Sequence, residues 1–570
     1  MTAGARPWRE AFRLRRRLLA VAAALTCCLA VAGCGGGQAG GGDGQAGPVP
    51  GGIYRFPLQT RIAGITPLDA IDADDQQVAH QVFEGLVRYE TRDDGTLATV
   101  PCLAESWEVN SDATVFRFTI RKRARFQPPV SRLVTARDVV RSWEIATDPV
   151  HPATHADLLS PIVGLDDSGR QLDRRDGLVG VRAIGRSVVR VQLRYPCADF
   201  PERLGQLAAA VVPVSYIDVV GRHEFERRPV GTGPFLVERW SSTSVRLIKN
   251  PDYWDTGRSA HVQRVHIRVV NGAARQWRQF RAGRIDFSEL PAERMRAVSA
   301  SSQVLSGEWA TKYFPTMAVG FVGVDMDDPA LGEKAPQGLA LRSALALSAD
   351  RAGVSEVAEG GVPAPVTVLV PPAVSSQDAD AGPLSYDPDK AKKDLKGAGV
   401  SALITQFWIA PGPESAAVGD VLAAGWLSAG IRASVLPTIT SEPPSPSARV
   451  PGLAGQQTFL GCWTADYPSP GAYLVPLFWR GSPSVAGAPA VSTMAGRDAP
   501  LRALIRQAES TVDDGARAAV WLKAEQRVLK TAACIPLYDV RLLRVVRSSV
   551  HDQQLDALGF MDMSRVWIGP

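Results

Sequence analysis

The sequence predicts a mixed α/β protein, because strand-like and helix-like patterns alternate along most of the chain. Residues 114–121 alternate apolar and polar side chains, as a strand with one buried face does. Residues 135–143 begin with Thr135 and carry an acid at Asp138, which is typical of a helix start. The chain has 570 residues, of which 45% are hydrophobic and 21% charged. This composition excludes a wholly disordered chain, a collagen-like repeat and a protein with many membrane spans.

Other segments continue the alternation. Two more segments, 188–193 and 265–270, have the composition and alternation of strands. A Pro-rich stretch at 441–451 indicates an exposed loop. Helical periodicity is clearest at residues 75–86, 339–348, 389–398, 416–429 and 501–530.

The formal net charge of +5 suggests a basic protein. The position of the excess charge along the chain argues against that interpretation. Residues 1–33 contain six arginines and one glutamate, which leaves 57 basic and 57 acidic residues in the rest of the chain. A basic surface extended over the whole protein would favour nucleic acid as a partner. Because the excess is confined to the first segment, we expect no nucleic-acid partner.

The first 33 residues are typical of an export signal. Arg13–Arg17 form a basic region, and residues 18–32 are apolar or small throughout. That stretch is shorter than the roughly 20 residues that span a bilayer and suits a signal peptide. Val31-Ala32-Gly33-Cys34 resembles the lipobox of bacterial lipoproteins, which implies a lipoprotein signal peptide at 1–33 and a diacylglyceryl group on Cys34. A plain secretory signal and a twin-arginine export signal are the alternatives.

Residues 34–52 follow as a glycine-rich segment, with ten glycines between positions 35 and 52. Such a segment has too little apolar surface to fold, so we expect a flexible tether about 20–25 Å in mean length. The predicted location is the extracytoplasmic face of a bacterial cell membrane, where a lipid on Cys34 would hold the protein.

Motifs for enzymatic chemistry are absent from the sequence. It has no GxSxG, SxxK, HExxH or Walker A pattern. His151 and His155 have a spacing of four residues, but Pro152 lies between them and indicates a loop rather than a metal site. Carboxylate pairs such as Asp166-Asp167 lie in turn-like contexts and are interpreted as solvated. We therefore expect neither an enzyme nor a bound metal or cofactor.

Several phrases resemble, in order and spacing, the family 5 extracellular solute-binding proteins of ABC transporters, which include binders of dipeptides, oligopeptides and nickel. Each phrase alone is weak evidence for the resemblance. Their joint order over roughly residues 53–540 is strong evidence. The phrases are Phe83-Glu84-Gly85-Leu86-Val87, Leu103-Ala104-Glu105-Ser106-Trp107, Gly231-Thr232-Gly233-Pro234-Phe235, Asn250-Pro251-Asp252-Tyr253-Trp254, Tyr386-Asp387-Pro388-Asp389 and Trp463-Thr464-Ala465-Asp466-Tyr467-Pro468.

The resemblance implies a two-lobe, type II periplasmic-binding-protein-like α/β fold with an extra subdomain in the first lobe. The first lobe would span residues 53–320, with the subdomain at about 76–195. The second would span 321–535, and residues 536–570 would return to the first. A monomeric protein of this kind captures a peptide or similar small solute between its lobes and delivers it to the permease subunits of an ABC importer. A ligand sensor of the same fold and, less favoured, a secreted hydrolase are the alternatives.

The resemblance also assigns candidate ligand-binding residues. In peptide-binding members, the aspartate matching Asp466 accepts a charge-assisted hydrogen bond from the ligand's α-ammonium group; the alternative is that Asp466 caps the turn that follows it. Trp463 and Tyr467 are candidates for apolar contact with the ligand, or for core packing. The chain departs from peptide binders between Pro437 and Pro451, where it has no aromatic residue.

Four cysteines remain beyond the predicted lipidation site, and they allow three disulfide connectivities in an oxidising compartment. Under the implied architecture, Cys102 and Cys197 fall in the first lobe, and Cys462 and Cys534 in the second. A disulfide between lobes would oppose hinge closure, so the resemblance predicts the pairs Cys102–Cys197 and Cys462–Cys534.

Overall fold

The computed structural model describes residues 47–569, except 174, 176, 359–360, 401–402, 439–456 and 480–497. Residues 48–570 form one compact unit. The predicted signal peptide at 1–33, Cys34, most of the predicted tether and the Pro-rich loop at 441–451 lie outside the described residues. Among the described residues, no helix is long and apolar enough to cross a membrane.

A four-stranded sheet follows directly after the tether. Its strand order is β1 (Ile53–Leu58), β10 (Arg264–Val269), β9 (Ser244–Lys249) and β8 (Phe235–Ser241). Side chains alternate along each strand, so that Tyr54, Val245 and Val265 enter one hydrophobic core while the side chains between them face outward. Residues near the C-terminus, including Met561 and Val566, complete this core.

A second four-stranded sheet belongs to the predicted subdomain. Its order is β4 (Ala104–Val109), β5 (Val115–Ile120), β7 (Val188–Gln192) and β6 (Val181–Ile184). The helix predicted at residue 135 is α3 (Ala136–Ala146), and the backbone N–H of Thr135 donates to Asp138 Oδ2 at 2.9 Å. The hairpin β2 (Val87–Thr91) and β3 (Leu97–Pro101) precedes this sheet.

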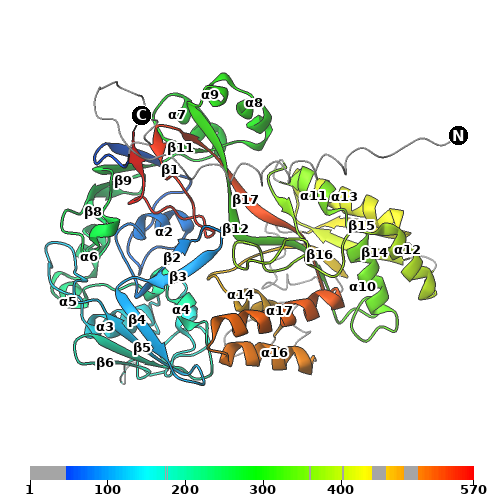
Figure 1. Cartoon of the computed structure of the whole chain (residues 1–570), viewed down its shortest axis with the longest axis horizontal. Helices are drawn as coiled ribbons and strands as arrows, with labels where there is room; N and C mark the ends of the chain where they lie inside the picture. Colours follow the sequence, from blue (N-terminus) through cyan, green and yellow to red (C-terminus); the bar gives the residue numbers. More distant parts are fainter. Residues whose placement is uncertain are drawn as a thin grey trace, which may run out of the picture. The chain divides into compact units, whose positions relative to one another are not determined.

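A seven-stranded mixed sheet joins distant parts of the chain (Figure 1). Its two long central strands are antiparallel neighbours, β12 (Trp309–Val324) and β17 (Cys534–Arg547). The order is β11 (Phe287–Glu289), β17, β12, β16 (Thr458–Thr464), β14 (Leu403–Ile409) and β15 (Ile431–Pro437), and β13 (Ala364–Pro365) pairs with β17. A short hairpin, β18 (Val550–His551) with β19 (Trp567–Ile568), follows.

The helices are short in the first half of the chain and longer in the second. Besides α3, the α-helices among the described residues are, in order, α2 (Ala73–Ala79), α4 (Phe200–Arg203), α5 (Val214–Val220), α6 (Arg222–Arg227), α7 (Ala273–Arg281), α8 (Met295–Ser299), α9 (Ser302–Leu305), α10 (Gly338–Leu347), α11 (Arg351–Val357), α12 (Pro388–Gly397), α13 (Pro413–Ser428), α14 (Gly471–Phe478), α16 (Ala499–Ser510) and α17 (Asp514–Thr531).

Two of the predicted helices have different limits. The single periodic segment at 501–530 is two helices, because the side chain of Asp513 accepts a hydrogen bond from Ala516 N and starts α17 as a new N-cap. The helix expected at 75–86 ends at Ala79, since the chain turns there before Gly85.

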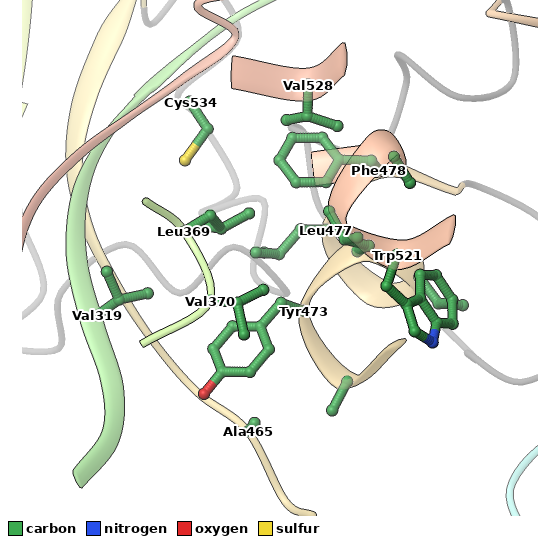
Figure 2. Packing of buried hydrophobic residues seen from close by; sticks show 14 of the residues in the cluster. Val319, Leu369, Val370, Ala465, Tyr473, Leu477, Phe478, Trp521, Val528 and Cys534 are labelled. Atoms are coloured by element: carbon green, nitrogen blue, oxygen red, sulfur yellow. The ribbon is translucent and has the colours of Figure 1, made fainter. Parts of the chain in front are cut away.

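The two ends of the central strands pack into different cores. Phe314 and Val546 belong to the core of the first sheet, whereas Val322 and Ile535 pack against the helices of the second half. The predicted lobe boundaries at residues 320 and 535 therefore fall within β12 and at the start of β17. Figure 2 shows the core beside this region, in which Tyr473, Leu477 and Phe478 of α14 face Leu369, Val370 and Val319.

Neither predicted disulfide is present: the structure shows all four described cysteines as thiols. Cys534 on β17 lies opposite Gly323, and Cys462 on β16 lies opposite Gly320, on the other side of β12. Two strand spacings, or about 9–10 Å, separate β16 from β17. A disulfide needs Cα atoms about 4.4–6.8 Å apart, so this pair cannot form without moving a strand. Figure 2 shows the Cys534 thiol directed toward Leu369 in the core.

The other pair fails for a similar reason. Leu103, next to Cys102, accepts a hydrogen bond from Arg121 N at the base of the β4–β5 hairpin. The backbone N–H of Cys197 donates to Ala113 O in the turn at the hairpin's tip. The length of the hairpin, about 15–20 Å, therefore separates Cys102 from Cys197.

The close packing of β12 against β16 depends on glycine at position 323. A Cβ added there would lie 2.3 Å from Cζ of Phe459, the residue opposite it on β16. We predict that Gly323→Ala lowers the free energy of unfolding by about 1–3 kcal/mol, the usual cost of overpacking. Gly397→Ala is the control, because a Cβ at that helical position meets no atom within 4 Å. Urea denaturation measures both, and equal stability of Gly323→Ala and the wild type would contradict the prediction.

Candidate functional site

A cavity of about 270 Å³ lies between the predicted subdomain region and the segment after β16. One wall comes from residues 157–168 and Arg203, and the other from residues 463–476. All three residues predicted to bind ligand line this cavity: Asp466, Trp463 and Tyr467. The structure thus brings the predicted residues together and adds a wall from a distant part of the sequence.

Pairing at the end of β16 positions Asp466. Thr464 lies opposite Ala318 of β12, and the backbone N–H of Ala465 donates to Met317 O. Gln206 Nε2 donates to the backbone carbonyl of Asp466, which holds the next residue against the other wall. The strand therefore ends at the cavity and directs Asp466 toward it.

Asp466 retains exposed surface, and its carboxylate accepts no hydrogen bond from any described residue. It therefore does not cap the turn that follows it, which was the alternative interpretation. Desolvation by the cavity walls raises the pKa of Asp466. The nearby positive groups of His155 and Arg203 oppose this shift, and the negative charge of Asp157 adds to it.

Sequence reasoning missed the opposite wall. Asp157 and Asp167 line the cavity; Asp167 belongs to a pair that was interpreted from the sequence as solvated, and Asp157 was not singled out. Asp167 is paired with Arg194 at 2.9 Å, but Asp157 has no ion-pair partner among the described residues. The cavity therefore holds two carboxylates, Asp157 and Asp466, that form no ion pair with any described residue, and His155 and Arg203 act on Asp466 only from a longer distance. No local sequence signal links these positions, because they are about 300 residues apart.

Arg203, one of the two positive groups that lower the pKa of Asp466, already has other partners. Arg203 is buried, its Nε lies 3.9 Å from Asp199 Oδ1, and its guanidinium group lies 4.8 Å from the centre of the Tyr467 ring. The hydroxyl of Ser469 donates to Asp199 Oδ2 at 2.7 Å. These contacts tie the segment around Asp199 to the segment after Asp466 and fix the position of Tyr467.

Trp463 and Tyr467 differ in exposure. Tyr467 is 6% exposed and belongs to the core, whereas Trp463 is half-buried at its edge. Trp463 Nε1 donates to Ala472 O at 2.9 Å, so the ring is fixed while part of it borders the cavity. Tyr467 therefore fits both interpretations, core packing and cavity wall, and Trp463 offers the larger accessible surface.

A second polar cluster was also missed. The buried carboxylate of Glu84 accepts hydrogen bonds from Tyr253 Oη at 2.6 Å, Trp254 Nε1 at 2.9 Å and Thr232 Oγ1 at 2.8 Å. Desolvation raises the pKa of Glu84, and these donors oppose the shift. Three phrases noted in the sequence thus meet at one carboxylate. Since all its donors are committed, we regard this cluster as structural.

The side chains of the cavity indicate which kind of ligand would fit it. Among the described residues, no group of three or more His, Cys, Asp or Glu side chains is arranged to hold a metal ion. The cavity combines aromatic walls with two carboxylates, an arrangement that suits a small ligand carrying a positive charge.

Comparison with known proteins decides the family. The profile of the bacterial extracellular solute-binding proteins, family 5 (middle region), matches residues 98–482, well over half of the chain. The chain belongs to this family. It is a solute-binding protein, and the resemblance seen in the sequence is confirmed.

Relatives agree with this assignment. The chain is 25% identical over 507 residues to di/tripeptide-binding protein 2 of Pseudomonas aeruginosa, covering 86% of this chain and 89% of that protein. It is also 25% identical over 477 residues to heme-binding protein A of Haemophilus influenzae, with 80% and 82% coverage. The solved structure of the periplasmic murein tripeptide binding protein MppA, in its unliganded open form, superposes with a TM-score of 0.77 at 19% identity, covering 92% of this chain and 99% of that one. The predicted type II α/β fold is confirmed.

Buried acids beside the cavity make stability depend on pH. Burial, with a further contribution from Asp199, raises the pKa of Glu509 on α16 to about 8, whereas an unperturbed glutamate titrates near 4.5. The folded state therefore keeps a proton that the unfolded state loses, and stability falls as pH rises from about 4.5 to about 8.

We predict that Glu509→Gln flattens this fall and is more stable than the wild type at pH 8, by on the order of 1 kcal/mol per unit of pKa shift. Urea denaturation at pH 5.5, 7 and 8.5 measures the effect. Glu356→Gln, an exposed substitution on α11, is the control. An unchanged slope in Glu509→Gln would refute the prediction.

Proposed function

We propose that this protein captures a peptide, or a similar small solute with a cationic amine, in the cavity lined by Asp466 and delivers it to the permease of an ABC importer. The support is the pair of carboxylates, Asp466 and Asp157, that have no ion-pair partner among the described residues. A ligand ammonium group would supply the missing positive charge. Relatives named as di/tripeptide-binding proteins and as a peptide transport protein, SapA, support the choice of peptide.

The proposed contacts follow from the positions of the side chains. Asp466 accepts a charge-assisted hydrogen bond from the ligand's α-ammonium group, since such bonds are about twice as strong as neutral ones. Asp157, from the opposite wall, adds to the negative potential. Trp463 and Tyr467 supply apolar contact for the ligand's carbon atoms. No side chain in the proposal makes or breaks a bond in the ligand, so the protein acts as a binding protein and not as an enzyme.

The proposed delivery step uses the two central strands. The chain crosses between the two sets of cores along β12 and β17, so these strands provide the hinge about which the lobes close. Closure would bring Asp157 and Asp466 together around the ligand and create a surface that the permease distinguishes from the open form. The protein works as a monomer in this scheme.

The proposal places the protein on the extracytoplasmic side of the membrane, anchored through Cys34. The lipobox-like residues Val31–Cys34 and the basic residues before them support the anchor. The glycine-rich residues 35–52 then act as the tether between the lipid and β1.

Asp466→Asn tests the ligand site. Isothermal titration with a series of di- to pentapeptides should show affinity about 10- to 100-fold lower in this variant, the usual range for a hydrogen bond to a charged group. N-acetylation of the peptide should weaken binding to the wild type by a similar factor. Acidification should also weaken it, and earlier than for an ordinary aspartate, because the pKa of Asp466 is raised.

Asp252→Asn is the matched control, because Asp252 is exposed and is not one of the residues that line the cavity. Full affinity of Asp466→Asn for a peptide with a free amine would refute the proposed ammonium contact. If peptides of every length fail to bind while a sugar raises the melting temperature, the peptide assignment itself is wrong.

Cys34→Ser tests the anchor. We predict that metabolic labelling with palmitate marks the wild type and the control Cys28→Ser, but not Cys34→Ser, which should leave the membrane fraction. Label retained by Cys34→Ser would show that the lipid is attached elsewhere.

A further inference from the structure

The outward face of the first sheet carries a row of basic side chains. The register places Arg55 of β1 opposite His266 of β10, His266 opposite Arg246 of β9, and Arg246 opposite Arg239 of β8. Arg264 and Arg268 lie two residues on either side of His266 and therefore point to the same face. We call these six residues the basic face; β1, β9 and β8 are labelled in Figure 1.

Most of these arginines have no partner. The side chains of Arg239, Arg246, Arg264 and Arg268 are exposed, and none makes a hydrogen bond or an ion pair with any described residue. Arg55 alone is paired, with Asp286 at 3.4 Å. Packing does not explain the row, because the buried side chains of the same strands, such as Val265, fill the core on the opposite face.

The surrounding electrostatics are positive. Burial and then the charges of Arg246, Arg268 and Arg55 lower the pKa of His266, and the charge of Glu238 opposes this shift. A neutral imidazole among arginines is the response expected where positive charge is already concentrated. Beyond residue 33, the chain has equal numbers of acidic and basic residues, so this concentration is local.

The tether enters the fold at this sheet. Ile53, the first residue of β1, lies opposite Arg264 of β10, about 5 Å away at the usual strand spacing. Only the 18 residues from 35 to 52 separate it from Cys34, and their mean span is roughly 20–25 Å. A lipid on Cys34 therefore keeps the basic face within reach of the bilayer surface at all times.

We infer that the basic face binds the anionic phospholipid headgroups of the membrane in which Cys34 is anchored. Guanidinium groups form paired hydrogen bonds to phosphate oxygens, and basic residues close to an anionic leaflet bind it additively. A lipid anchor on a flexible tether leaves the orientation of the protein open, whereas a second, electrostatic contact fixes which face of the sheet meets the membrane. The inference rests on the proposed lipid anchor for its biological setting, but the contact itself does not require the lipid.

Vesicle binding by a chain that begins at Gly35 tests the contact without the anchor; residues 48–570 form one compact unit, so this chain keeps the fold. The probes are vesicles of phosphatidylglycerol and phosphatidylcholine at 1:3, and of phosphatidylcholine alone. We expect binding to the anionic vesicles only, with a partition coefficient that falls steeply between 50 and 300 mM NaCl. Replacing arginine should weaken it by roughly fivefold per residue, so Arg246→Gln with Arg268→Gln should lose about 25-fold.

The matched control removes two exposed basic residues from the other half of the chain, Arg432→Gln with Lys392→Gln, and should bind as the wild type does. Equal binding to both vesicle types, equal loss in the control, or binding to heparin beads without binding to vesicles would overturn the inference. The last result would indicate an anionic glycan as the partner. Because no lipid is attached in this assay, its outcome is independent of the palmitate result.

Discussion

The pairing of β12 with β17 is the constraint on which the rest of the structure depends. These strands come from residues 309–324 and 534–547, and their opposite ends are anchored in different cores through Phe314 and Val322. β16 pairs with β12, and its last residues hold Asp466 at the cavity. A shift of one residue in this register would turn every side chain of β12 to the other face and displace the cavity wall. The ligand site is thus a consequence of long-range strand pairing, and no local segment could form it alone.

Charged residues around the cavity divide into two kinds. Arg203, Asp199 and Ser469 are buried; Arg203 is paired with Asp199, and Ser469 donates a hydrogen bond to Asp199, so these contacts hold the walls together. Asp466 and Asp157 are exposed and unpaired among the described residues, which leaves their charge available to a ligand. Burying an unpaired carboxylate is costly, and ligand binding with closure would offset that cost only when a cation is supplied. This difference in pairing supports a ligand-binding role for Asp466 and Asp157.

Local sequence rules predicted local structure well. The capping residues of α3 and the alternation of β5 and β10 are visible in short windows, and the structure has these elements. The helix break before Asp514 was missed because apolar periodicity continues across it, although Asp513 is a good N-cap residue.

The disulfide prediction failed because lobe membership does not specify distance: Cys462 and Cys534 share a sheet but lie on opposite sides of β12. Asp157 was missed because only the folded chain brings it to Asp466.

The net charge of the chain beyond residue 33 does not show that the protein has one negatively and one positively charged region. The chain beyond residue 33 is balanced, yet unpaired carboxylates gather in the cavity while unpaired arginines gather on the face of the first sheet. Strand alternation produces the second pattern, because it turns every other residue of β9 and β10 outward, so three arginines separated in sequence become neighbours. At physiological ionic strength each field extends only about 8 Å. A cationic solute and an anionic surface can therefore each be attracted to a different part of the same neutral protein.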